Sequence, residues 1–147
     1  MKHFTIEELI YSETALHKRM RNKTNQQIET NLRMLVETVL DPLREAYGKP
    51  ITVTSGYRCK ELNRAVGGVS NSQHVSGCAA DITVNSRSGN RDLMRLAVKL
   101  GLPIDQAIDE KDFQWVHISC AGGLTPPRHQ LLRYDGRTYR NITIQEI

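Results

Sequence analysis

Residues 72–84 read SQHVSGCAADITV, a polar loop that runs directly into an alternating segment, and this stretch decides the fold. Alternate positions in residues 79–84 are apolar, which is the pattern of a half-buried strand. Asp81 therefore points to the face opposite the buried apolar side chains. His74 lies seven residues before Asp81, in the loop that feeds the strand. The stretch predicts a strand with one apolar face and a metal-capable side chain on the other.

Residues 115–120, WVHISC, show the same alternation. Their apolar side chains share one face, and His117 points to the other. If the two strands are neighbours, His74, Asp81 and His117 converge. Such a trio leaves one position of a tetrahedral metal free for water, the arrangement of catalytic zinc. Taken singly, a histidine in such a loop is usually an ordinary loop residue, and an aspartate in a strand often caps a backbone amide. The joint spacing of the three residues is what favours a metal site.

Helices are predicted in the N-terminal third of the chain. Thr5 followed by Glu8 fits a capping box. Apolar residues then recur at three-to-four spacing in a long amphipathic segment, which we expect to bend or restart at Asp41-Pro42 because proline lacks a backbone donor. The predicted helices span residues 6–11, a segment that begins near Ser12, and residues 25–48.

Strands dominate the rest of the chain, together with one more helix that we expect Asn90 to cap and Gly101 to end. The Asp135-Gly136 pair indicates a hairpin. The predicted strands are residues 51–55, 79–84, 105–109, 115–120, 131–134 and 138–144. The fold class is therefore α+β, with N-terminal helices packed on a mainly antiparallel sheet. A chain of 147 residues has the size of one domain, so we expect a single unit over residues 1–147.

Composition narrows the function classes. The formal net charge is +4 with basic residues in scattered stretches, and neither a basic helix nor interleaved aromatics indicates nucleic-acid binding. No apolar run approaches the roughly 20 residues of a membrane span, and the N-terminus lacks a signal-peptide core, so we expect synthesis in the cytoplasm and no membrane insertion. Three irregularly spaced cysteines, Cys59, Cys78 and Cys120, predict reduced thiols rather than a disulfide framework.

The loop and strand motif resembles that of a known family. Ser72, His74, Gly77, Ala79 and Asp81 fill every fixed position of the S-x-H-x-x-G-x-A-x-D motif of the zinc D-alanyl-D-alanine peptidases, which share their fold with the Hedgehog signalling domain. The resemblance implies that fold and one bound zinc ion.

Three further stretches extend this resemblance over residues 4–120. Residues 115–119, WVHIS, are similar to the family's second motif, which supplies the third zinc ligand. Residues 54–68 resemble its S-G-Y-R segment, and residues 4–15, FTIEELIYSETA, resemble the start of small phage and bacterial members. The resemblance implies zinc held by His74, Asp81 and His117.

The resemblance also assigns the other site residues. Arg58 matches the family arginine that holds the substrate and steadies the developing oxyanion, although an arginine after a turn is also a common surface residue. Relatives commonly carry an acid three residues before the last histidine, where this chain has Gln114, which cannot exchange a proton. We expect Glu110 to act as the general base instead. Asp112 and Asp109 are the next candidates.

The expected function is a zinc metallopeptidase that cuts peptide bonds in bacterial peptidoglycan, as a D-Ala-D-Ala carboxypeptidase or an endolysin-like endopeptidase. The substitution of Gln114 leaves open an alternative, a zinc-stabilised binding or virion-associated module with the same fold and no catalysis. We expect a monomer whose partners are peptidoglycan peptides. It would act on the cell wall after release from the cytoplasm.

Overall fold

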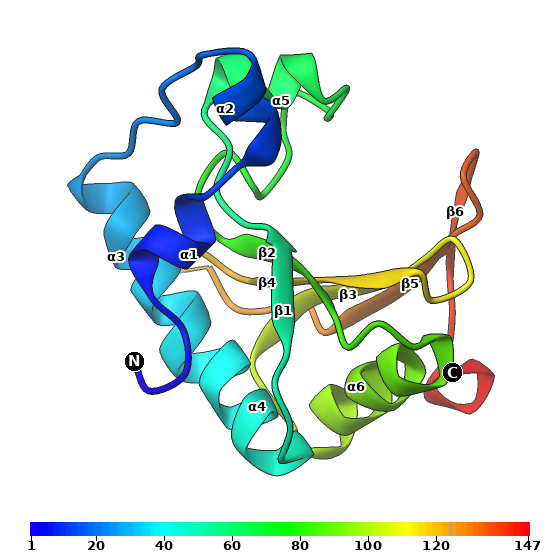
Figure 1. Ribbon diagram of the computed structural model, residues 1–147. Coiled ribbons are helices and arrows are strands. Elements are labelled where there is room, and N and C mark those ends of the chain that lie inside the picture. The colour runs from blue at the N-terminus through cyan, green and yellow to red at the C-terminus, as the bar shows by residue number, and fades with distance from the viewer. Residues whose placement is uncertain (124) are drawn as a thin grey trace.

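The two alternating segments form neighbouring strands, β2 (Ala79–Thr83) and β4 (Trp115–Cys120), of a six-stranded sheet (Figure 1). The computed structural model describes residues 1–123 and 125–147. The strand order is β1-β2-β4-β3-β5-β6. All neighbours are antiparallel except β3 and β5, so the α+β fold with a mainly antiparallel sheet is confirmed. The other strands are β1 (Thr52–Ser55), β3 (Ile104–Glu110), β5 (Gln130–Tyr134) and β6 (Tyr139–Asn141).

Helices cover the face of this sheet to which the alternate apolar side chains of β2 and β4 point. Ala80 and Ile82 of β2 and Val116 and Ile118 of β4 are fully buried in the core against the helices. In Figure 1 α4 and α6 lie below the sheet, whereas α2 and α5 stand on its other side. The helices are α1 (Ile6–Ile10), α2 (Glu13–His17), α3 (Gln26–Leu35), α4 (Asp41–Tyr47), α5 (Lys60–Ala65) and α6 (Arg87–Lys99), with a 3-10 turn at Ile144–Glu146.

The long N-terminal helix changes its winding at the expected place. Between α3 and α4 the residues Val36–Leu40 form a π-helical turn, and the Asp41 N–H donates to the Val36 carbonyl. Pro42 follows with no donor of its own. A π-turn widens the backbone by one residue and so makes room for a proline ring that would clash in a regular helix. The helix therefore continues through Pro42 with one irregular turn.

The predicted start of α6 is wrong. Ser86 caps this helix by accepting a hydrogen bond from the Gly89 N–H, whereas Asn90 lies inside the first turn and is buried. The Asn90 amide binds other segments: its oxygen accepts from the Val84 N–H at 2.9 Å, and its nitrogen donates to the Phe113 carbonyl at 2.9 Å. Asn90 thus provides hydrogen-bond partners for backbone groups of two loops. The fold brings these loops to Asn90, so the local sequence does not predict this role.

The predicted strands and thiols agree with the structure. The hairpin β5-β6 forms around Asp135, whose carboxylate accepts from the Arg137 and Thr138 N–H groups, although β6 is shorter than expected. All three cysteines are free thiols. Within the described residues no helix is both long enough and apolar enough to cross a membrane.

The loop after β1 packs directly on α1, and this contact positions the site described below. The Tyr57 N–H donates to the Leu9 carbonyl at 2.8 Å. A Cβ at Gly56 would lie 2.1 Å from the same carbonyl oxygen, so only glycine fits there. By contrast, Gly48 ends α4 with φ +79° and has open space around its Cα.

We therefore expect Gly56→Ala to destabilise the protein more than Gly48→Ala. The second change costs about 1 kcal/mol for a left-handed backbone without glycine. Gly56→Ala forces backbone segments apart, and overpacking of this kind costs about 2–3 kcal/mol or more. Urea unfolding measures the free energy of unfolding of both variants. Equal losses of stability in Gly56→Ala and Gly48→Ala would show that the backbone near Leu9 shifts easily to make room for a Cβ.

Candidate metal centre

Three metal-capable side chains meet on the face of the sheet opposite α4 and α6. His74 comes from the loop before β2, Asp81 from β2 and His117 from β4. Asp81 and His117 are direct partners in the antiparallel pairing, so their side chains lie on the same face. One ligand atom from each of the three residues lies within 4.8 Å of the others. The convergence expected from the sequence is therefore present in the fold.

The distances fit a tetrahedral zinc ion. His74 Nε2 and His117 Nδ1 each lie 3.3 Å from Asp81 Oδ1. Zinc ligands at about 2.0–2.1 Å in tetrahedral geometry lie about 3.3–3.4 Å apart, which matches these separations. The donor set, two imidazoles and a carboxylate, is also one that zinc prefers. The cluster therefore fits one zinc ion and leaves a fourth position open.

The backbone of Gly56 orients His74. The carbonyl oxygen of Gly56 lies 2.6 Å from His74 Nδ1, so the imidazole donates its Nδ1–H there and turns Nε2 toward Asp81. The Arg58 N–H in turn donates to the His74 carbonyl at 3.0 Å. Sequence reasoning missed the role of Gly56. Its place in the S-G-Y-R segment was the available signal, but a backbone carbonyl leaves no mark in residue type.

The two histidines keep Asp81 ionised. Burial alone would raise the pKa of Asp81, but the imidazoles of His74 and His117 outweigh burial and hold that pKa well below its usual range. The rings also contact each other edge to face, with centroids 5.1 Å apart. An ionised carboxylate between two oriented imidazoles is prepared to bind a cation.

Glu110 lies on the same face as the cluster. Ile108 pairs directly with His117, and Glu110 follows two positions later on β3, so both face the metal-binding side chains. Burial, followed by the negative charge of Asp81, raises the pKa of Glu110 to about 7. Its carboxylate lines a groove of about 690 Å³ that also contains the three metal-capable residues.

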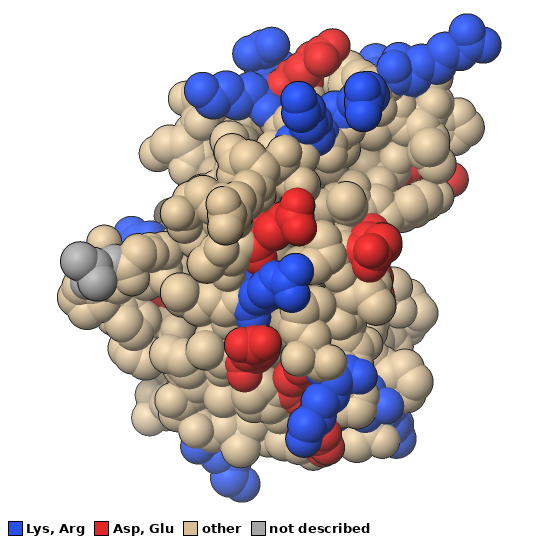
Figure 2. All heavy atoms as spheres, turned by 90° about the vertical axis from the view of Figure 1, so that its left-hand side faces the viewer, with Lys and Arg blue, Asp and Glu red and all other residues tan. Residues whose placement is uncertain are grey.

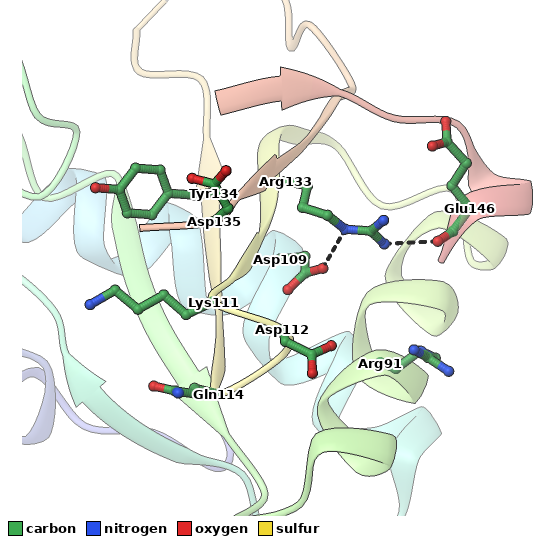
Figure 3. A pocket seen from close by; sticks show the side chains of 9 residues that line it. All are labelled: Arg91, Asp109, Lys111, Asp112, Gln114, Arg133, Tyr134, Asp135 and Glu146. Carbon is green, nitrogen blue, oxygen red and sulfur yellow. Dashed lines mark hydrogen bonds and ion pairs between the residues drawn. The ribbon is translucent and has the colours of Figure 1, made fainter. Parts of the chain in front are cut away.

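The alternative acids lie on the other side of β3. Asp109 is buried and accepts from Arg133 Nε at 2.6 Å and from the Phe113 N–H at 2.6 Å. Asp112 is exposed and pairs with Arg87 at 3.6 Å. Both acids, together with Gln114, line a separate cavity of about 610 Å³ (Figure 3). Among the three candidate acids, only Glu110 borders the groove.

Arg58 supplies a cation to the groove. Its Nε is buried and has no hydrogen-bond partner among the described residues, and its Nη2 lies 3.5 Å from Ser72 Oγ. Burial lowers the pKa of the guanidinium and the charge of Asp81 counteracts this effect. Because an unpaired buried donor is costly, this guanidinium is suited to bind an oxygen of a ligand in the groove.

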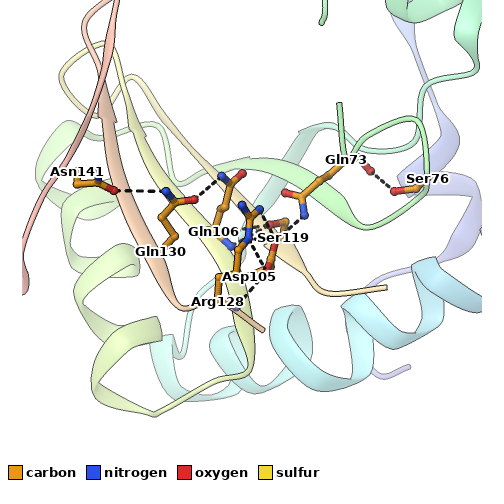
Figure 4. Close-up of polar contacts among 8 residues, drawn as sticks. All are labelled: Gln73, Ser76, Asp105, Gln106, Ser119, Arg128, Gln130 and Asn141. Atoms are coloured by element: carbon orange, nitrogen blue, oxygen red, sulfur yellow. Dashed lines mark hydrogen bonds and ion pairs between the residues drawn. The ribbon is translucent and has the colours of Figure 1, made fainter. Parts of the chain in front are cut away.

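Polar side chains form another wall of the groove (Figure 4). Gln73 donates to Asp105 at 2.8 Å, and Arg128 binds the same carboxylate at 2.7 Å. The Arg128 hydrogen bond holds the pKa of Asp105 below its usual value. Gln106 continues the wall through a 2.7 Å hydrogen bond to Gln130. These amides are fixed donors and acceptors, of the kind that peptide groups require.

The C-terminal hairpin closes the groove on another side. Tyr139 of β6 stacks on Tyr134 of β5, with ring centroids 4.4 Å apart, and both line the groove. Lys111 lies over the Trp115 ring at 5.7 Å and lines it as well. The metal-capable cluster therefore sits in a groove with aromatic and cationic walls.

Comparison with known proteins identifies the class. The family model of peptidase M15 matches residues 2–119, and the chain belongs to this family. Among individual proteins it is similar to the zinc D-Ala-D-Ala carboxypeptidase of Streptomyces albus G, with 49% identity over 49 residues. These residues are 33% of this chain and 19% of that protein, so the chain matches about a fifth of its relative's length. The resemblance seen in the sequence motifs is thereby confirmed.

The metal assignment predicts that His117→Ala abolishes stoichiometric zinc binding, because it removes one of three protein ligands. Elemental analysis of purified, dialysed protein measures the zinc content. His17→Ala, an exposed histidine on α2, is the matched control and should keep one zinc per chain. Full zinc content in His117→Ala would refute the assignment.

Proposed function

We propose that the protein is a zinc metallopeptidase that hydrolyses peptide bonds in the stem peptides or crosslinks of bacterial peptidoglycan. The observation that carries this proposal is the His-Asp-His cluster at the floor of a groove that also contains Glu110 and the unpaired Nε of Arg58. Membership of the peptidase M15 family and the name of the Streptomyces relative support it. A monomer with a single domain over residues 1–147 stays part of this proposal.

The residues divide the work of hydrolysis. Zinc, when bound by His74, Asp81 and His117, polarises a peptide carbonyl and makes water a stronger acid. The Glu110 carboxylate takes a proton from the attacking water and later passes it to the leaving amine, so that water and an amide become a carboxylic acid and an amine. A pKa near 7 suits a group that must both accept and release a proton.

Arg58 complements this chemistry. Its guanidinium can donate to a substrate carboxylate or to the oxygen on which negative charge develops, and such a donor strengthens as the charge grows. The fixed amides of Gln73 and Gln106 and the rings of Trp115 and Tyr139 would hold the peptide along the groove. The resemblance to small phage and bacterial members supports an endolysin-like action on the wall after release from the cytoplasm.

The main test is cleavage of isolated peptidoglycan, followed through newly released amino groups. The zinc-loaded protein should cleave, and a chelator should stop it. Loss of a general base typically lowers the rate by about 10²–10⁴-fold, so we expect Glu110→Gln to show that loss with its zinc retained. Asp112→Asn removes an exposed acid outside the groove and should leave cleavage unchanged.

Two results would contradict this reading. Full activity in Glu110→Gln would remove Glu110 from the mechanism. No cleavage by folded, zinc-loaded protein on walls of several chemotypes would favour the alternative, a non-catalytic zinc module with the same fold. The absence of an acid at Gln114 is the observation behind that alternative.

Arg58 has its own test. We expect Arg58→Gln to lower cleavage by about 10²–10³-fold, the usual cost of removing one donor to a developing oxyanion. The zinc content should not change, because the Arg58 side chain is not a ligand. Arg33→Gln, an exposed arginine of α3, is the control. Steady-state rates on a soluble stem peptide measure the effect, and equal rates for both variants would exclude Arg58 from the reaction.

A further inference from the structure

A cluster of cations lies at one end of the molecule and takes no part in the metal centre. It comprises α2 with the loop after it and α5, which appear at the top of Figure 1, where Asn22 of the loop contacts Cys59 at the start of α5. Figure 2 shows Lys and Arg side chains gathered at the same end. We call residues 12–24 and 59–66 the basic head. Its basic residues are Lys18, Arg19, Arg21, Lys23, Lys60 and Arg64.

The basic head carries the whole formal net charge of the protein. The chain has 20 basic and 16 acidic residues, a net charge of +4. The head contains six of the basic residues and two acids, Glu13 and Glu61, which also gives +4. The other residues therefore contain 14 of each sign and are neutral overall. The two stretches look unrelated in the sequence, and the fold joins them.

These cations are unpaired. All six side chains belong to exposed residues, and within residues 1–123 and 125–147 none of them lies in an ion pair. Elsewhere Arg128, Arg133 and Arg140 each pair with an acid at 2.6–2.8 Å. Uncompensated like charges repel one another and create a strong local potential that attracts an anionic partner.

A half-buried group of hydrogen bonds around Asn22 keeps the two basic stretches together. The Asn22 amide donates to the Tyr57 carbonyl at 2.8 Å and accepts from the Cys59 N–H at 2.8 Å. The Tyr57 hydroxyl donates to the Lys23 carbonyl at 2.8 Å. The backbones that carry the cations are therefore fixed relative to each other, so the charge pattern exists before any partner arrives.

The shape and composition of the basic head favour an extended polyanion. Neither the groove nor the second cavity is lined by any of the six cations, so the head is an open surface rather than a pocket for a small anion. It contains no Phe, Tyr or Trp on which nucleic-acid bases would stack. Its helices are five and six residues long, too short for an amphipathic helix that lies in a membrane.

The basic head also adjoins the groove. Arg58 precedes the second stretch, and Val66, Gly67 and Val69, which follow α5, line the groove directly. A polymer held on the head therefore lies next to the metal centre. A partner attached to the substrate would gain most from this arrangement, because binding at one point raises the local concentration at the other.

We propose that the basic head binds a bacterial wall polymer with regularly spaced phosphate groups, of the phosphodiester-linked polyol type, and so holds the groove against the peptidoglycan that carries it. This inference rests on the proposed function for the setting in which the polymer is met. Several phosphate contacts acting together release counterions, so the binding weakens steeply as salt increases.

The test compares two triple variants of equal charge. Lys18→Gln, Arg21→Gln and Arg64→Gln change the head, whereas Arg33→Gln, Lys49→Gln and Lys99→Gln change exposed residues elsewhere. Each lowers the formal net charge by three, from +4 to +1 in the wild-type chain and from +5 to +2 when Glu110→Gln removes one acid. Both are made in the Glu110→Gln background, so that cleavage does not alter the walls during co-sedimentation.

We expect the head variant to bind intact walls about tenfold more weakly than the control variant, since it loses three phosphate contacts. The difference should disappear on walls stripped of phosphodiester polymer by hydrofluoric acid. On intact walls, soluble poly(glycerol phosphate) should compete for the head and reduce the binding of the control variant toward that of the head variant. Equal weakening in both variants, or full binding to stripped walls, would overturn the proposal. Tighter binding to anionic lipid vesicles or to RNA at equal phosphate concentration would overturn it in favour of those partners.

Cleavage is measured separately on soluble crosslinked peptides, which carry no polymer. There the head substitutions, made with Glu110 intact, should leave the rate unchanged. A wild-type protein inactive on these peptides would contradict the proposed function and leave the wall-binding result standing. A head variant inactive on them would show that these cations act in the groove itself, contrary to the proposal.

Discussion

The metal centre depends on one hydrogen bond, that between His74 Nδ1 and the Gly56 carbonyl oxygen at 2.6 Å. This bond selects the imidazole tautomer and directs Nε2 toward Asp81, so it links a backbone carbonyl to the ligand set. The carbonyl is held in place because the loop after β1 packs on α1, where only glycine fits against Leu9. The N-terminal helices thus support the site although they contribute no ligand to it.

The surroundings shift the pKa values of two carboxylates on this face of the sheet in opposite directions. The pKa of Asp81, between two imidazoles, is held low, whereas the pKa of Glu110, buried and near that negative charge, is raised to about 7. Environments that separate the pKa values of neighbouring acids are how a protein assigns them different roles. Here one acid is suited to hold a cation and the other to carry a proton.

Period-two alternation made much of this site predictable. It placed Asp81 and His117 on the polar faces of two strands, and the same alternation separates Glu110 from Asp109, which points to the cavity behind β3. Local sequence patterns gave wrong predictions where a side chain forms hydrogen bonds to segments distant in the sequence. Asn90 has the residue type of a helix cap, yet its amide joins two loops. The role of Gly56 lies in a carbonyl, for which the S-G-Y-R segment is the signal in the sequence. The basic head exists only once the loop after α2 meets the segment before α5, so it has no signature in local sequence.

The C-terminal hairpin lines the groove but lies outside the part of the chain that the family model matches. The match to the family model ends at residue 119, before β5 and β6, yet Tyr134, Arg137 and Tyr139 line the groove. β6 is a short edge strand with exposed residues, attached to the sheet only through β5. The wall of the groove that this hairpin builds carries none of the three metal-capable side chains, so under the proposed function changes in the hairpin would alter the choice of peptide and leave the ligand set intact.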